Sequence, residues 1–135
     1  MAAIYLDTSA VLRAILETGT TPEVEISISN ASLLVASRLT TVETSRATHR
    51  LRQLGQFGEA QLADMEGRIE ALWSRCDLWE LSRDVCDVAR EVAPGKILRA
   101  LDALHLATFV LARRRIPDLE LLTVDERLRA AAEGF

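Results

Sequence analysis

Four short apolar runs, each followed by a stretch with helical spacing, constrain this chain more than any other feature of its sequence. The runs cover residues 3–6, 33–36, 78–81 and 119–124. Short strands of branched residues and leucine that alternate with helices predict a parallel sheet covered on both faces. We therefore expect an α/β fold, a three-layer α/β/α sandwich with a mostly parallel central sheet.

The segments between these runs have the spacing of amphipathic helices. We expect helices over residues 8–17, 40–54, 59–73, 82–92, 99–115 and 125–132. Thr40 and Glu43 have the Thr-x-x-Glu spacing of a capping box that would open the second of these helices. Residues 23–30 alternate as a strand does, through Val24, Ile26 and Ile28, although a short helix is also possible.

The size of the chain fits one compact domain over residues 1–135. Its 135 residues are 49% hydrophobic, which excludes disorder as a description of the whole chain. No apolar stretch reaches the roughly 18–20 residues that a membrane-spanning helix needs. The N-terminal residues lack the basic start of a secretory signal. We expect a cytoplasmic protein with no membrane contact.

Two further features of composition bear on partners and redox state. Cys76 and Cys86 fit neither a zinc pattern nor a disulfide framework, so both are expected to be reduced residues that fill the core. The net charge of −4 argues against binding nucleic acid through the overall field. The cationic residues, however, are almost all arginine, with Lys96 the single lysine. This bias suits phosphate contacts, but an arginine-rich genome would produce it as well.

Acidic residues follow the predicted strands. Asp7 and Asp125 come directly after the first and fourth runs, and Glu43 lies shortly after the second. Each could be a helix cap when taken alone. Taken together with Asp102, which lies on an otherwise apolar helix face, they are predicted to meet at one edge of the sheet. Clustered carboxylates need a compensating cation, and Mg²⁺ or Mn²⁺ suits their oxygen atoms.

Four sequence blocks in order carry a family resemblance. LDTSAVLRAILE, LTTVETSRATHR, LRALDALHLA and LLTVDERL resemble the PIN-domain ribonucleases, in particular the VapC-type toxins of type II toxin–antitoxin pairs. The resemblance spans nearly the whole chain, although residues 55–76 carry no family motif.

The resemblance implies an activity and a set of partners. Asp7, Glu43, Asp102 and Asp125 would be the catalytic acids and the ligands of Mg²⁺ or Mn²⁺ in an endoribonuclease that cleaves single-stranded RNA. A cognate antitoxin would cover this acidic groove, and the toxin would form a homodimer through helices. Two alternatives stay open, namely a PIN-like module that binds RNA or protein without cutting, and a housekeeping PIN nuclease.

Several polar residues near the four acids allow two interpretations. Ser9 and Thr123 match hydroxyl residues that flank the first and last acids in the family, but local turn bonds would also explain them. His105 lies three residues after Asp102 and is interpreted as a structural histidine. Arg46 and Arg50 could line a phosphate-binding rim or an ordinary solvated face.

Overall fold

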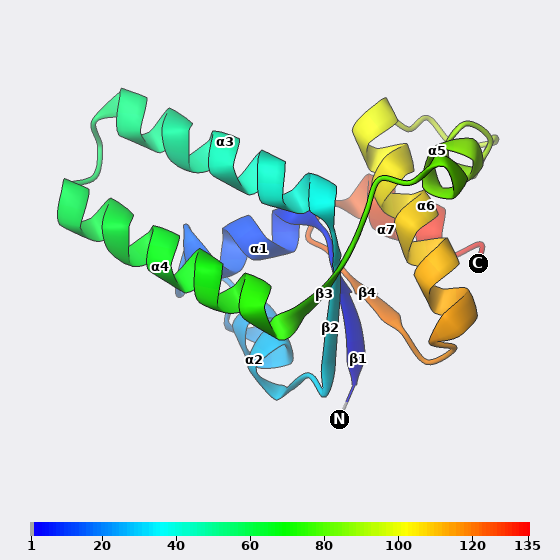
Figure 1. Ribbon diagram of the computed structural model, residues 1–135, viewed down its shortest axis with the longest axis horizontal. Helices are drawn as coiled ribbons and strands as arrows, with labels where there is room; N and C mark the ends of the chain where they lie inside the picture. Colours follow the sequence, from blue (N-terminus) through cyan, green and yellow to red (C-terminus); the bar gives the residue numbers. More distant parts are fainter. Residues whose placement is uncertain (1) are drawn as a thin grey trace.

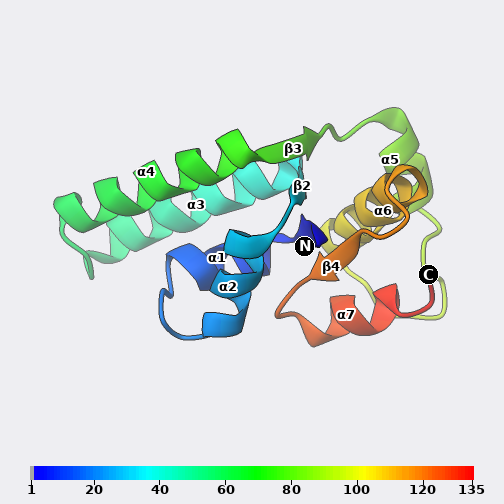
Figure 2. The same ribbon diagram turned by 90° about the horizontal axis from the view of Figure 1, so that it is seen from below.

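A parallel sheet with helices on both faces forms the centre of the molecule (Figures 1 and 2). The computed structural model describes residues 2–135. The strands are β1 (Ala3–Leu6), β2 (Leu33–Ser37), β3 (Cys76–Trp79) and β4 (Glu120–Leu122), in the order β3-β2-β1-β4. All three strand pairings are parallel, which confirms the predicted α/β class.

Seven helices lie in residues 2–135. They are α1 (Thr8–Ile15), α2 (Pro22–Asn30), α3 (Arg38–Leu54), α4 (Glu59–Arg75), α5 (Arg83–Ala89), α6 (Ala100–Arg115) and α7 (Glu126–Ala132). Helices α1, α2 and α4 pack on one face of the sheet, and α6 and α7 pack on the other. This arrangement is the predicted three-layer sandwich.

Alternation along β1 divides the interior into two hydrophobic cores. Ile4 and Leu6 pack in the core shared with α1, α2 and α4, whereas Ala3 and Tyr5 pack in the core shared with α6 and α7. Successive strand residues point to opposite faces, so a central strand buried on both sides must be apolar throughout. The four residues of β1 are all buried, which accounts for the continuous apolar run that opens the chain.

Residues 23–30 belong to helix α2 and not to a strand. Pro22 occupies the first turn of this helix, where its missing N–H costs nothing. Val24 and Ile28 are buried four residues apart, and Ile26 between them is exposed. The alternation in the sequence was therefore misleading, because the buried positions follow the helical period.

The predicted capping box at Thr40 is wrong, because α3 begins earlier. The Ser37 side chain caps α3 by accepting a hydrogen bond from the Leu39 N–H at 3.1 Å. Thr40 is buried inside the helix, and Glu43 lies in the second turn. Glu43 therefore has no capping role in this structure.

Other boundaries differ from the predictions by a few residues. Strand β3 begins at Cys76, two residues before the predicted start, because Cys76 and Asp77 already pair with Leu34 and Val35 of β2. Strand β4 is shorter than predicted, and α5 ends at Ala89, before the predicted end of its helix.

The two cysteines are free, but they do not both fill the core. Cys86 is exposed on α5, because this short helix buries only Val85. The prediction was wrong for Cys86. Cys76 is partly buried at the start of β3, and burial raises the pKa of its thiol to about 11.

Helices α3 and α4 form a hairpin that projects beyond the sheet (Figure 1). Gly55 ends α3 with φ of 68°, a conformation that glycine adopts without strain. Arg52 ties the two helices together through ion pairs with Glu59 at 3.1 Å and Glu66 at 2.7 Å. Within residues 2–135, no helix has the length and apolar character needed to cross a membrane.

A core truncation tests the packing of α6 against the sheet. Leu106 is 1% exposed, so Leu106→Ala should lower the free energy of unfolding by about 2–5 kcal/mol through lost burial and the cavity left behind. Leu54→Ala is the matched control, because Leu54 is 59% exposed and its truncation should change stability by at most about 0.5 kcal/mol. Urea unfolding followed by circular dichroism measures both, and equal losses would contradict this packing.

Candidate active site

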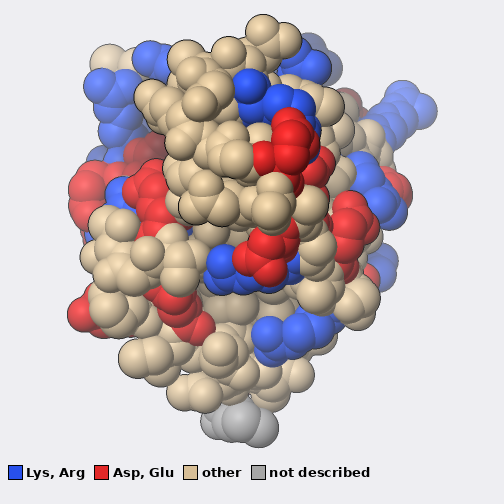
Figure 3. All heavy atoms as spheres, turned by 90° about the vertical axis from the view of Figure 1, so that its left-hand side faces the viewer, with Lys and Arg blue, Asp and Glu red and all other residues tan. Residues whose placement is uncertain are grey.

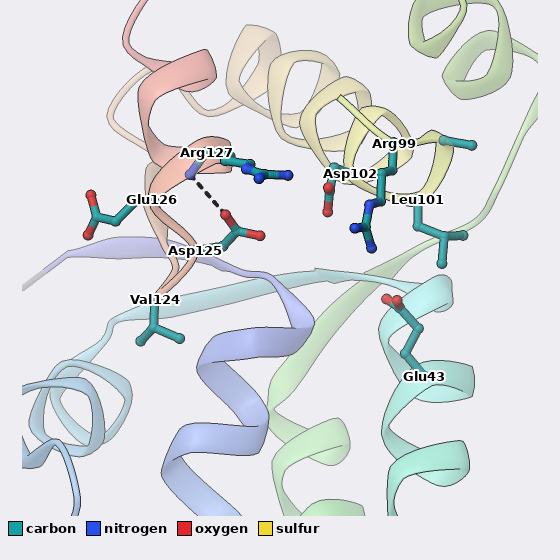
Figure 4. A pocket seen from close by; sticks show the side chains of 9 residues that line it. Glu43, Arg99, Leu101, Asp102, Val124, Asp125, Glu126 and Arg127 are labelled. Carbon is teal, nitrogen blue, oxygen red and sulfur yellow. Dashed lines mark hydrogen bonds between the residues drawn. The ribbon is translucent and has the colours of Figure 1, made fainter. Parts of the chain in front are cut away.

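An open pocket lies beyond the carboxyl ends of the central strands (Figure 4). Its volume is about 870 Å³. Its wall includes Glu43 from α3, Asp102 from α6 and Asp125 at the start of α7. Parallel strands deliver the residues that follow them to one edge of the sheet, which is where ligands bind in open α/β folds. The structure therefore brings three of the four predicted acids to one pocket.

Asp7, the fourth acid, does not line the pocket. Its side chain is 4% exposed and caps α1 by accepting a hydrogen bond from the Ala10 N–H at 3.0 Å. The Ser9 hydroxyl contacts both carboxylate oxygens at 2.8 and 2.9 Å, and the Thr123 hydroxyl donates to Oδ2 at 2.7 Å. Burial raises the pKa of Asp7, and these hydrogen bonds oppose that rise. The capping interpretation of Asp7 is correct, and its buried carboxylate is joined through Thr123 to the segment that leads to Asp125.

Ser9 and Thr123 connect the ends of β1 and β4. Their hydroxyl oxygens lie 3.1 Å apart. Ser9 accepts a hydrogen bond from the Val124 N–H at 3.1 Å, and Thr123 accepts one from the Asp125 N–H at 3.0 Å. The same two hydroxyls thus orient Asp7 and fix the turn that presents Asp125. The bond from the Asp125 N–H to Thr123 is the local turn bond expected for Thr123. The bond from Thr123 to Asp7 adds a link to the end of β1.

Glu43 is held by a buried histidine. His105 Nε2 lies 2.8 Å from Glu43 Oε1, and the Thr8 hydroxyl donates to the same oxygen at 2.6 Å. If Nε2–H donates to the carboxylate, Nδ1 can accept from the Tyr5 hydroxyl, which lies 3.2 Å away. His105 is buried and does not line the pocket, so its placement agrees with the structural interpretation.

The environment of Glu43 favours its charged form. Burial raises the pKa of the carboxyl, but the hydrogen bonds from His105 and Thr8 outweigh burial and hold the pKa below its ordinary value. Glu43 therefore remains a carboxylate at neutral pH. Burial raises the pKa of Tyr5 far above its ordinary value, so its hydroxyl keeps the proton it can donate to His105.

Asp102 has the opposite environment. Burial raises its pKa, and the nearby carboxylates of Asp125 and Glu43 raise it further, against the pull of His105 and Arg99. Within residues 2–135, no hydrogen-bond donor contacts its carboxylate. Figure 4 shows Asp102 and Asp125 on opposite sides of the pocket, with Asp125 held by the Arg127 N–H at 2.9 Å. The net effect of burial and of the neighbouring charges disfavours the charged form of Asp102.

The chemistry of this donor set fits a hard divalent cation. The pocket offers carboxylate oxygens, and the repulsion on Asp102 would be relieved by a positive ion. In the described part of the chain, however, no three acidic, histidine or cysteine side chains stand close enough together to form a complete metal group. The carboxylates therefore share one pocket without forming a closed coordination shell.

Sequence reasoning missed several residues that shape the pocket. Thr8 and Tyr5 complete the hydrogen bonds around Glu43 and His105, and Arg99 and Arg127 line the pocket wall. Thr8 is part of the LDTS block, but nothing in the sequence links it to a glutamate 35 residues away. No spacing rule marks the two arginines either.

A comparison with known protein families identifies the family of this chain. The sequence profile described as PIN domain matches residues 4–134. The chain belongs to the PIN domain family. Ribonuclease VapC46 of Mycobacterium tuberculosis is 34% identical over 134 residues, which are 98% of this chain and 92% of that protein. Ribonuclease VapC35 of the same species is 31% identical and covers 98% of this chain and 91% of its own length.

Solved structures share the fold of this PIN domain. PAE2754 from Pyrobaculum aerophilum superposes with a TM-score of 0.69 at 20% identity, covering 98% of this chain and 81% of its own. FitAcB from Neisseria gonorrhoeae superposes with a TM-score of 0.68 at 20% identity, covering 96% of this chain and 93% of its own. A chain of a toxin–antitoxin complex from Klebsiella pneumoniae superposes with a TM-score of 0.65 at 21% identity, covering 92% of this chain and 87% of its own.

The crowding of carboxylates predicts that neutralising Asp102 stabilises the metal-free protein. A raised pKa means that the charged form costs stability, and the cost grows as pH rises through the raised pKa. Asp102→Asn should therefore raise the melting temperature at pH 7 in EDTA, and the gain should shrink as pH falls through the carboxyl range. Asp118→Asn, at an exposed site outside the pocket, should change little. Scanning fluorimetry over pH 4–8 measures this, and a destabilised Asp102→Asn variant would mean a structural role.

Proposed function

We propose that this PIN domain, residues 1–135, is a metal-dependent endoribonuclease that cleaves single-stranded RNA as the toxin of a toxin–antitoxin pair. The observation that carries the proposal is the pocket lined by Glu43, Asp102 and Asp125, with the buried Asp7 bonded to Thr123, two residues before Asp125. Full-length similarity to proteins named ribonuclease VapC46 and ribonuclease VapC35 supports the same reading.

The four acids would hold Mg²⁺ or Mn²⁺. Such an ion, when bound, supplies Lewis-acid polarisation of a phosphoryl oxygen and a water nucleophile at neutral pH. Asp102 has both oxygens free of hydrogen bonds within residues 2–135, so it is the ligand most available to a cation. Asp125 uses Oδ1 to cap α7 and keeps Oδ2 for the pocket.

Glu43 and Asp7 would play supporting parts in the same site. Glu43 Oε1 is occupied by Thr8 and His105, so Oε2 is the oxygen that can bind the ion or accept a proton from the attacking water. Asp7 is fixed by Ser9 and Thr123, and its charge adds to the attraction of the pocket for a cation. The chain's own role is to hold these oxygens in place before substrate arrives.

Substitution of the acids tests the proposed chemistry. Asp102→Asn and Glu43→Gln keep the shape of each side chain and remove one charge, so both should lower Mg²⁺-dependent cleavage of single-stranded RNA by at least about 100-fold. Glu43→Gln retains an oxygen that accepts from Thr8 and His105 but loses the charge that these bonds stabilise, so the variant should stay folded with a modestly lower melting temperature. Asp118→Asn is the control and should cleave normally. A fluorescence-quenched RNA substrate, with Mg²⁺ and then with EDTA, provides the measurement.

The same assay separates the alternatives. Activity retained in Asp102→Asn would point to a contaminating nuclease or to a site that does not use Asp102. A wild-type protein that binds RNA without cutting it in Mg²⁺ or Mn²⁺ would be a regulatory PIN module. A protein that cuts RNA in vitro but leaves growth unaffected when expressed alone would be a housekeeping nuclease.

An antitoxin is the proposed protein partner. Structural neighbours include a toxin–antitoxin complex from Klebsiella pneumoniae and VapBC2 from Rickettsia felis, the latter with a TM-score of 0.59. In this chain, Val42 and Leu101 are 55% and 47% exposed and adjoin Glu43 and Asp102. We infer an antitoxin helix whose apolar side chains cover these two residues, while an arginine or lysine reaches the acids.

The partner surface gives a prediction about inhibition. Expression of this chain alone should arrest growth, and the neighbouring gene should relieve the arrest. Val42→Ala with Leu101→Ala should weaken inhibition of cleavage by the antitoxin about tenfold or more, because most binding energy comes from apolar contact. Leu54→Ala, which also removes an exposed leucine, should not change it. Raising salt should weaken inhibition only modestly, and inhibition that disappears in salt would contradict an apolar contact.

Two expectations from the family resemblance stay predictions. A homodimer formed through helices would be visible as a doubled mass in light scattering. A location in the cytoplasm would place the protein with its RNA substrate and its antitoxin, and cell fractionation tests that location.

A further inference from the structure

A basic surface follows the acidic pocket along helix α3. We name it the α3 arginine stripe and define it by Arg46 and Arg50, with His49 and Gln53 beside them. These residues and Arg52 line a shallow pocket of about 450 Å³ that includes no carboxylate. Arg46 and Arg50 are exposed, and no acidic residue among residues 2–135 forms an ion pair with either. Arg52 differs, because Glu59 and Glu66 neutralise it.

The stripe continues from the wall of the active site. Glu43, Arg46 and Arg50 are spaced three and four residues apart, so they share one side of α3. A rise of 1.5 Å per residue places Arg46 about 4.5 Å and Arg50 about 10.5 Å beyond Glu43 along the helix axis. At roughly 3.4 Å per stacked nucleotide, this distance corresponds to about one to three nucleotides.

Charge is divided between the two parts of this surface. Figure 3, which looks onto the end of the α3–α4 hairpin, shows cationic and acidic side chains in several small groups and no continuous field of one sign on this face. The pocket itself places Glu43, Asp102, Asp125 and Glu126 against two arginines. A polyanion entering that pocket needs favourable contacts elsewhere, since the net charge of the chain is −4.

We propose that Arg46 and Arg50 bind backbone phosphates of the single-stranded RNA next to the scissile bond. This inference rests on the proposed function and states where the RNA strand would run, namely along α3 from the pocket. Guanidinium groups form bidentate contacts with phosphate. The pocket beside Arg46 and Arg50 is lined by cationic and polar side chains alone, and such a lining suits a polyanionic strand. Arg46 and Arg50 are positioning residues, because they act away from the reacting phosphate.

Binding without cleavage provides the first test. Asp102→Asn protein in EDTA, with Arg46→Gln and Arg50→Gln added, is titrated with a labelled 12-nucleotide RNA at several salt concentrations. The slope of log K against log salt should become less steep by about 1.4, because each phosphate contact on a single strand contributes about 0.7. Affinity at 0.1 M salt should fall on the order of tenfold. Arg83→Gln with Arg90→Gln makes the same change in net charge at the two ends of α5, outside the stripe, and should leave the slope unchanged.

Cleavage kinetics provide the second test, in otherwise wild-type protein. Arg46→Gln with Arg50→Gln should raise KM for the 12-nucleotide RNA about tenfold or more, by the loss of the same phosphate contacts, with kcat nearly unchanged. Cleavage of a dinucleotide, which carries only the scissile phosphate, should not change.

The outcomes separate this inference from the proposed function. Loss of kcat on the dinucleotide, or equal effects of the α5 control, would overturn the stripe while leaving the nuclease assignment intact. Unchanged RNA affinity together with a change in oligomeric mass would assign the stripe to a protein interface. Wild-type protein that does not cut RNA would instead refute the proposed function itself.

Discussion

The parallel pairing of β1 with β2 on one side and β4 on the other is the constraint on which the site depends. It brings the carboxyl ends of three strands to one edge, so the residues that follow them meet although they are far apart in sequence. Asp7 follows β1 and Asp125 follows β4 after a turn of two residues. Helix α3 begins directly after β2 and places Glu43 in the wall of the same pocket.

Two sets of hydrogen bonds then fix Asp7 and Glu43 in place. Asp7 is oriented by Ser9 and Thr123, which also set the turn before Asp125. Glu43 is oriented by Thr8 and His105. An ionised carboxylate is costly to bury unless hydrogen bonds compensate it, so these donors make it possible to place charge beside an apolar core. Asp102 lacks such donors, and burial together with the charges of Asp125 and Glu43 raises the pKa of its carboxyl.

The strand-end acids could be predicted from sequence because strand polarity alone fixes where they lie. Asp7, Asp125 and the α/β class follow from short apolar runs, each ended by a polar residue. The link between Glu43 and His105 could not be predicted, since it joins residues 62 positions apart on two helices whose rotation is set by packing. The cap at Ser37 was missed because a Thr-x-x-Glu match three residues later imitates a helix start. Residues 23–30 misled because a short helix with two buried positions can alternate in sequence.

Under the proposed function, the division of charge between the acidic pocket and the α3 arginine stripe would allow a chain of net charge −4 to bind RNA. Electrostatic attraction at physiological salt decays over about 8 Å, so local charge decides binding more than net charge does. The scissile phosphate would face carboxylates and be repelled without a cation, whereas phosphates one to three nucleotides away would face Arg46 and Arg50. Affinity for the strand and competence to cut it would thus reside in different residues. Metal removal should then abolish cleavage while leaving most of the RNA affinity in place.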